Sequence, residues 1–196
     1  MEQSDLNHHI SRQFNEDLSA LRHRVLHMGG LVERQVDRAM RALTRGDAAL
    51  AEAVMAEDDH VDRLEVALDE ECRRILALRQ PAASDLRLVV ATIKMVTDLE
   101  RVGDEARKIG ECALRLSSHD REGAAFDRMP GLGRHVGAML SGVLDAFARL
   151  DAHRALEVAR LDRMVDSDYQ FVLRSASATM MEHPDQVPVF LDLIWA

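Results

Sequence analysis

Aromatic side chains are scarce in this 196-residue chain, since only 4% of its residues are Phe, Trp or Tyr. β-Sandwiches and β-barrels are normally rich in aromatic and β-branched residues, so the shortage disfavours an all-β fold. The residue types that dominate instead, chiefly Ala, Leu, Arg, Glu and Met, favour or tolerate helix. Apolar residues make up 47% of the chain and charged residues 30%, which is typical of a globular protein rather than a disordered one. The composition therefore indicates an all-α protein.

An excess of basic charge is also missing. The formal net charge is −9, which disfavours nucleic acid as a partner because phosphate binding requires a concentrated basic surface. The first predicted helix does carry one local basic stripe, formed by Arg34, Arg38, Arg41 and Arg45. A solvated surface is the simplest explanation of that stripe.

Cysteine is limited to Cys72 and Cys112, and no CxxC motif is present. Both lie inside helical patterns, so we expect free, buried thiols in a reducing compartment. Residues 1–15 lack the apolar segment of a signal peptide, and no run approaches the roughly 18 apolar residues of a membrane span. We therefore expect a cytoplasmic protein that does not insert into a membrane.

Apolar residues recur every three or four positions in three long segments, which predicts three amphipathic helices. The first covers about residues 14–43, the second ends at Gln80-Pro81, and the third runs over about residues 86–116. Gly46 and Asp47 provide a helix stop and a new N-cap between the first two. Residues 119–131 are polar, contain Gly and Pro130, and are predicted to form a linker.

The helical pattern then restarts, and eight residues recur in the same order 104 positions later. They are Ala42, Arg45, Asp47, Ala51, Val54, Asp58, Val61 and Asp62, which match Ala146, Arg149, Asp151, Ala155, Val158, Asp162, Val165 and Asp166. Shared helix composition alone would give scattered matches without a shared cap. We therefore predict two tandem three-helix bundles, at residues 1–118 and 132–196, joined by the linker at residues 119–131.

The second repeat looks shorter than the first. Pro184 matches the proline that ends the second helix of the first repeat, so the third helix of the second repeat should begin near Val187. The sequence stops at Ala196, and we expect this repeat to be C-terminally truncated. Its last helix would then leave an apolar face open, which suggests association, and we expect a homodimer.

Carboxylates occur in three pairs spaced four residues apart, which is one helical turn, so each pair projects from one face. The pairs are Asp58 and Asp62, Glu100 and Asp104, and Asp162 and Asp166. If the second and third helices face each other, the first two pairs converge. Four carboxylates in one patch repel each other unless solvent or a cation separates them. Oxygen ligands suit Fe, Mn, Mg or Ca, and less commonly Zn.

Other interpretations of the acidic residues remain open. Glu57 and His60 form the ExxH half-motif of a di-iron site, although Met164 stands where the second repeat would need the histidine. A carboxylate-bridged metal-storage or di-iron-type helical protein is therefore the alternative function, and a plain helical scaffold with solvated acidic pairs is a third interpretation. The sequence contains no P-loop, GxSxG motif or Gly-rich phosphate loop, so we expect no enzymatic activity.

Residues 98–104 (DLERVGD) resemble the most specific part of the PhoU family signature, with Asp85-Leu86-Arg87 and Lys94 upstream. The resemblance extends from about Leu18 to Ala196 and includes both repeats. It implies two three-helix bundles whose acidic motifs hold iron or zinc, including multinuclear clusters, with Mn or Mg as further candidates. Carried over by position, the metal-binding residues would be Asp58, Asp62, Glu100, Asp104, Asp162 and Asp166. The fourth pair of the family pattern would lie beyond Ala196, which places the second cluster in doubt.

The same resemblance implies a function. PhoU-family proteins act with the ATPase subunit of the phosphate ABC transporter and with a phosphate-sensing histidine kinase. We therefore expect a negative regulator of phosphate uptake and of phosphate-starvation signalling, which works as a metal-binding helical adaptor between these partners.

Overall fold

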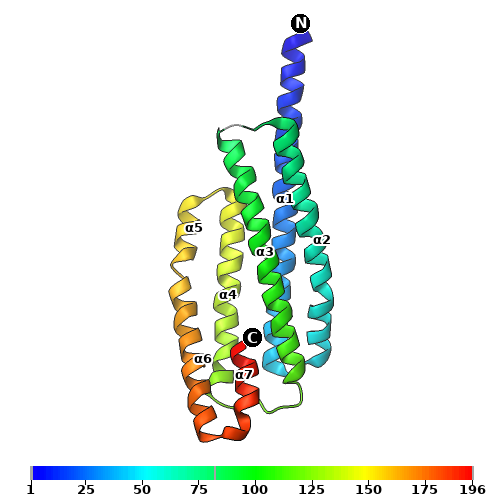
Figure 1. The fold of residues 1–196 in the computed structure, drawn as a ribbon. Coiled ribbons are helices and arrows are strands. Elements are labelled where there is room, and N and C mark those ends of the chain that lie inside the picture. Colours follow the sequence, from blue (N-terminus) through cyan, green and yellow to red (C-terminus); the bar gives the residue numbers. More distant parts are fainter. Residues whose placement is uncertain (1, 82, 196) are drawn as a thin grey trace.

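The computed structural model describes residues 2–81 and 83–195, with side chains described from residue 13 onward. No β-strand occurs within these ranges, which confirms the all-α prediction. The elements are α1 (Glu2–Arg45), α2 (Ala48–Arg79), α3 (Ala83–Arg115), α4 (Ala124–Arg149), α5 (Ala152–Ala159), α6 (Asp162–Glu182), the 3-10 helix η1 (Pro184–Gln186) and α7 (Val187–Trp195). Helices α1–α3 form one antiparallel bundle, and α4 to α7 stand beside it (Figure 1).

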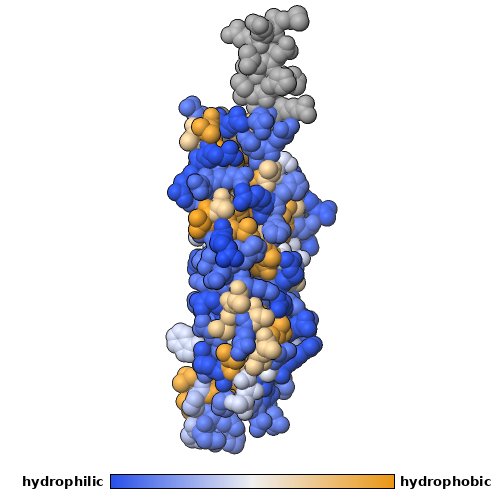
Figure 2. Space-filling model, turned by 90° about the vertical axis from the view of Figure 1, so that its right-hand side faces the viewer, coloured by the Kyte–Doolittle hydropathy of each residue, from blue (hydrophilic) through white to orange (hydrophobic). Residues whose placement is uncertain are grey.

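A shared apolar seam holds α1, α2 and α3 together. Val25 and Val32 of α1, Val61 and Leu68 of α2, and Val96 of α3 are all buried in it. The seven-residue spacing on α1 and α2 is two helical turns, so each helix presents one apolar stripe to the others. Each fully buried side chain of this kind contributes about 1.5–3 kcal/mol. The outer face is mainly hydrophilic, with small apolar patches, as amphipathic helices require (Figure 2).

The corner between helices occurs twice, as the repeat predicted. Gly46 has a left-handed φ of 67°, and Leu150, 104 positions later, has a φ of 54°. The carboxylate of Asp47 accepts a hydrogen bond from the amide three residues on at 3.0 Å, and Asp151 does the same at 2.9 Å. Both repeats therefore end their first helix in the left-handed region and start the next with an Asp N-cap.

Helices α1 and α4 pack against each other through two glycines. A Cβ atom on Gly29 would overlap the side chain of Leu144, and one on Gly133 would lie 3.0 Å from Cγ of Met40. Gly133 and Leu144 stand 104 positions after Gly29 and Met40. The two contacts are therefore reciprocal, and a pseudo-two-fold axis relates α1 to α4. The glycines are required here because they let the two backbones approach closely.

Two predictions about the second repeat were wrong. Helix α4 begins at Ala124, inside the predicted linker at residues 119–131, because the buried Phe126 and Met129 offset the hydrogen bond that Pro130 removes from the helix. The repeat also implied one continuous counterpart of α2. The structure instead divides it into α5 and α6, because the amides of Arg160 and Leu161 bond to carbonyls three residues back, at 3.1 and 2.9 Å, and tighten the chain into a turn.

Helix α7 begins at Val187, as predicted, and closes the lower end of the molecule (Figure 1). Phe190 is buried there, with its ring centroid 5.7 Å from that of Phe126. Cys72 and Cys112 are free and buried, as predicted, and burial raises their pKa values to about 11 and about 12. No helix in the described ranges has the length and apolar character needed to cross a membrane.

Candidate functional site

The four carboxylates predicted to converge do gather where α2 faces α3. Asp58 and Asp62 project from α2, and Glu100 and Asp104 project from α3. Burial raises the pKa of Glu100, and the negative charges of Asp104, Glu65, Asp62 and Asp58 raise it further. This mutual repulsion shows that the side chains share one electrostatic environment. We call Asp58, Asp62, Glu100 and Asp104 the acidic seam.

Asp58 is the innermost member of the acidic seam, with only 6% of its surface exposed. Its Oδ1 accepts a hydrogen bond from Nε2 of Gln35 on α1 at 3.1 Å. Gly103 of α3 lies directly opposite, since a Cβ atom there would stand 3.3 Å from Oε1 of Gln35 and 3.6 Å from Oδ1 of Asp58. Gly103 therefore allows α3 to approach the buried polar pair, at a helix-propensity cost of about 1 kcal/mol.

Arg107 supplies a positive charge to the acidic seam. Its Nε lies 2.9 Å from Oδ2 of Asp58, its guanidinium also pairs with Glu111, and one Nη lies 3.5 Å from Asp104. Burial opposes the charged form, but Glu111, Asp104 and Asp58 outweigh it and raise the pKa of Arg107. The chain thus places a cation of its own among these carboxylates.

Arg107 does not cancel all of the negative charge. Burial raises the pKa of Asp62, and the charges of Asp58, Asp104 and Asp59 raise it further, while Arg107 lowers it. Each of these three repulsions is larger than the attraction of Arg107, so repulsion exceeds attraction at Asp62. The acidic seam retains an excess of negative charge at neutral pH.

The donor chemistry of the acidic seam fits a hard or borderline cation, because every donor is an oxygen. The buried Oε1 of Gln35 has no hydrogen-bond partner and adds another oxygen beside Asp58. Across residues 13–81 and 83–195, however, no three His, Cys, Asp or Glu side chains are placed to hold a metal ion as they stand. Arg107 occupies Oδ2 of Asp58, so a metal bound by that oxygen would displace Arg107.

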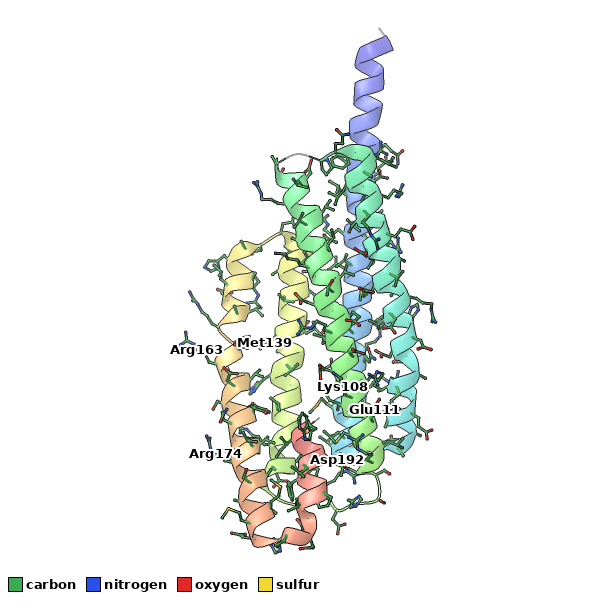
Figure 3. The ribbon with its side chains drawn as sticks, viewed as in Figure 1. Lys108, Glu111, Met139, Arg163, Arg174 and Asp192 are labelled. Carbon is green, nitrogen blue, oxygen red and sulfur yellow. The ribbon has the colours of Figure 1, made fainter. Side chains whose placement is uncertain are left out.

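The third carboxylate pair lies elsewhere. Asp162 and Asp166 are exposed on α6, and the structure does not bring them to the acidic seam. Arg163, between them, and Arg174 project outward from α6 and away from α3 (Figure 3). The ExxH half-motif is not assembled into a site either, because Glu57 pairs with Arg38 of α1 and His60 is exposed.

A second buried carboxylate, which the sequence did not indicate, links α4 to α6. Asp168 is 1% exposed and accepts hydrogen bonds from Nε of Arg128 at 2.9 Å and Nδ1 of His135 at 2.6 Å. Burial opposes ionisation, but the bonds from His135 and Arg128 outweigh it and hold the pKa of Asp168 below its usual range. Arg128 also lies 5.5 Å from the ring centroid of Phe171. This network of hydrogen bonds joins α4 to α6 within the second repeat.

Gln35 and Arg107 were also missed from the sequence, although each left a signal. Gln35 lies within the apolar stripe of α1, between Val32 and Val36, where a polar side chain needs a partner. Arg107 stands three residues after Asp104 and so faces the same side of α3.

The fold and site define an all-helical protein of two related repeats with an acidic seam in the first. A family model described as the PhoU domain matches residues 25–113 and 129–194. The chain is 47% identical over 191 residues to the phosphate-specific transport system accessory protein PhoU homolog of Pseudomonas aeruginosa, covering 97% of this chain and 79% of that protein. It is 43% identical over 195 residues to the accessory protein PhoU of Escherichia coli, covering 100% and 80%.

Solved structures agree with these relatives. The crystal structure of PhoU from Pseudomonas aeruginosa is similar with a TM-score of 0.89 and 45% identity, covering 93% of this chain and 87% of that one. The phosphate transport system regulatory protein PhoU from Streptococcus pneumoniae gives a TM-score of 0.82 at 28% identity, covering 93% and 85%. The chain belongs to the PhoU family. This membership supports a role in the regulation of phosphate transport.

Proposed function

We propose that the chain is a cytoplasmic negative regulator of phosphate uptake and of phosphate-starvation signalling. It acts as an adaptor between the ATPase subunit of a phosphate ABC transporter and a phosphate-sensing histidine kinase, and it works as a homodimer without catalysing a reaction. The observation that carries the proposal is 43–47% identity, over nearly the whole chain, to accessory proteins of the phosphate-specific transport system. Long, rigid helix faces suit such a role because they present extended docking surfaces.

The acidic seam has a part in this proposal as a metal site. Asp58, Asp62, Glu100 and Asp104 would hold iron or zinc, with Mn and Mg as further candidates, and Asp162 and Asp166 would contribute to a second site. A bound cation would neutralise the charge that now raises the pKa values of Asp62 and Glu100. The all-oxygen donor set and the orphaned Oε1 of Gln35 support this assignment.

Metal binding is tested by elemental analysis of the purified chain and by thermal unfolding with and without a chelator. A metal bound only by the native state adds stability according to its concentration relative to Kd. We expect co-purified metal and a Tm that falls on chelation, and we expect the variant Asp58→Asn/Asp104→Asn to lose both effects. A wild-type chain without stoichiometric metal, whose Tm does not respond to added Fe, Zn, Mn or Mg, would contradict the metal site but leave the adaptor function intact.

The regulatory function is tested with a phosphate-starvation reporter in a deletion strain grown with abundant phosphate. Deletion should turn the reporter on and raise phosphate uptake, and expression of this chain should restore repression. Unchanged reporter expression and unchanged phosphate uptake after deletion would contradict the regulatory proposal.

A further inference from the structure

An elongated groove of about 780 Å³ runs between α1 and α4, apart from the acidic seam. Its α1 wall covers residues 33–45, and its α4 wall covers residues 130–137. On α1 this is about 18 Å of helix at 1.5 Å per residue. The groove therefore extends over three turns rather than forming a compact pocket.

The groove carries most of the basic stripe that the sequence indicated. Arg34, Arg41 and Arg45 line it from α1, while Arg134 joins them from α4. Arg38, the remaining member of the stripe, instead pairs with a carboxylate on α2. Two carboxylates of α1 also line the groove, so its formal charge is positive in a chain whose net charge is −9.

Most of these arginines have no carboxylate partner among the described side chains. Arg41 lies 3.6 Å from Asp37. Among the side chains that the structure describes, Arg34, Arg45 and Arg134 form no ion pair. What sets these arginines apart is that they line one groove, where their positive charge would be complemented by an anionic partner.

The floor of the groove is shaped by small residues of α4. Gly133 touches Met40, where α4 meets α1, whereas an added Cβ atom on Gly137 would meet no atom within 4 Å. The open space above Gly137 is part of the groove. Because no side chain stands on α4 at Gly137, a third helix that lies in the groove could approach α4 closely there.

We propose that this groove docks an acidic amphipathic helix of the transport machinery; this rests on the proposed function. Arg34 and Arg45 are about 16 Å apart along α1, too far for one small anion to bridge but matched by carboxylates spaced over three helical turns. Glu33 and Asp37 also line the groove and would repel the continuous charge of a polyphosphate or a nucleic acid. A helix with separated acidic side chains meets the arginines and avoids those two carboxylates.

The experiment measures binding of the full chain to the purified transporter ATPase subunit by biolayer interferometry at two salt concentrations. The test variant is Arg34→Glu/Arg45→Glu. Its matched control is Arg163→Glu/Arg174→Glu, which makes the same charge change at arginines that point outward from α6 (Figure 3). A second variant, Gly137→Leu, fills the groove without changing charge and raises helix propensity. Its control, Ala138→Leu, places the same side chain at an exposed neighbour outside the groove.

We expect the Arg34→Glu/Arg45→Glu variant to weaken binding about tenfold or more and to reduce its salt dependence, with the α6 control within about twofold of wild type. Gly137→Leu should weaken binding about fivefold, and Ala138→Leu should leave it unchanged. If the wild type binds and both groove variants bind as tightly as their controls, the proposal that the groove is the docking site is wrong, and the adaptor function is unaffected. No wild-type binding would overturn both. If short polyphosphate competes for the groove, the proposed acidic helix is wrong as its occupant, and a free polyanion is favoured instead.

Discussion

Replacing Arg107 with methionine tests whether the chain's own cation holds the acidic seam together. Methionine keeps much of the length and apolar stem of arginine but removes the guanidinium that contacts Asp58, Asp104 and Glu111. Asp58 would then be left with Gln35 as its one hydrogen-bond partner among the described residues. The carboxylates of the acidic seam would also repel each other without a neutralising charge between them.

The expected loss follows from how deeply the pair is buried. Removing one partner of a fully buried ion pair costs about 3–5 kcal/mol, whereas an exposed pair contributes about 0–1 kcal/mol. The side chain of Arg107 is 32% exposed and that of Asp58 is 8% exposed, which places this pair between the two limits. We expect Arg107→Met to lower the free energy of unfolding of the metal-free protein by about 1–3 kcal/mol.

Urea unfolding followed by helical circular dichroism measures this loss. The matched control is Arg73→Met, because Arg73 pairs with Asp69 on α2 while its side chain is 67% exposed, and it should cost less than about 0.5 kcal/mol. A double-mutant cycle with Asp58→Asn should give a coupling energy of about 1 kcal/mol or more. The reasoning is refuted if Arg107→Met costs no more than Arg73→Met, or if the cycle shows no coupling.

Three further substitutions test other parts of the structure. Leu150→Gly should raise the free energy of unfolding by about 0.5–1 kcal/mol. Leu150 is 58% exposed and has a left-handed φ of 54°, which glycine adopts without strain. Thermal melts measure the change, and a lower Tm would contradict this reasoning. Asp168→Asn should destabilise by about 1–3 kcal/mol at neutral pH. Since the pKa of Asp168 is lowered in the fold, its contribution is present above about pH 4 and lost as the pH falls through the folded pKa, so a pH-independent difference in urea titrations would contradict the assignment. Glu100→Gln should stabilise the metal-free protein by a few tenths of a kcal/mol at neutral pH. Because the pKa of Glu100 is raised in the fold, this advantage should vanish on acidification, and an advantage that persists below about pH 4 would argue against the repulsion.

The sequence predicted those parts of the structure that depend on local periodicity. The spacing of apolar residues located α1, α2 and α3, and the 104-residue offset located the second Asp N-cap. The match of Pro184 to Pro81 located the start of α7 at Val187. The convergence of Asp58, Asp62, Glu100 and Asp104 also followed, because it needs only the helical period and two facing helices. Whether these residues bind metal stays a prediction.

The features that were missed depend on packing between helices. Arg107 reaches Asp58 across the α2–α3 contact, and the position of Gln35 opposite Gly103 is set by the depth of that contact. Pro130 indicated a linker, but burial of its neighbours kept the segment helical. The break between α5 and α6 has no glycine or proline to mark it, so neither composition nor periodicity indicates a turn there.

The reciprocal packing of α1 and α4 has a consequence for how the two halves diverge. In a symmetric dimer of identical subunits, one substitution changes both copies of an interface at once. Here both copies belong to one chain, so each can change alone. Gln35, which bonds Asp58, has Met139 as its counterpart 104 positions later, on the inner side of α4 in Figure 3. The first half therefore supports its buried Asp58 from the first helix of the repeat. The second half carries an apolar side chain at that position and buries a different carboxylate, Asp168, which two other side chains of α4 hold.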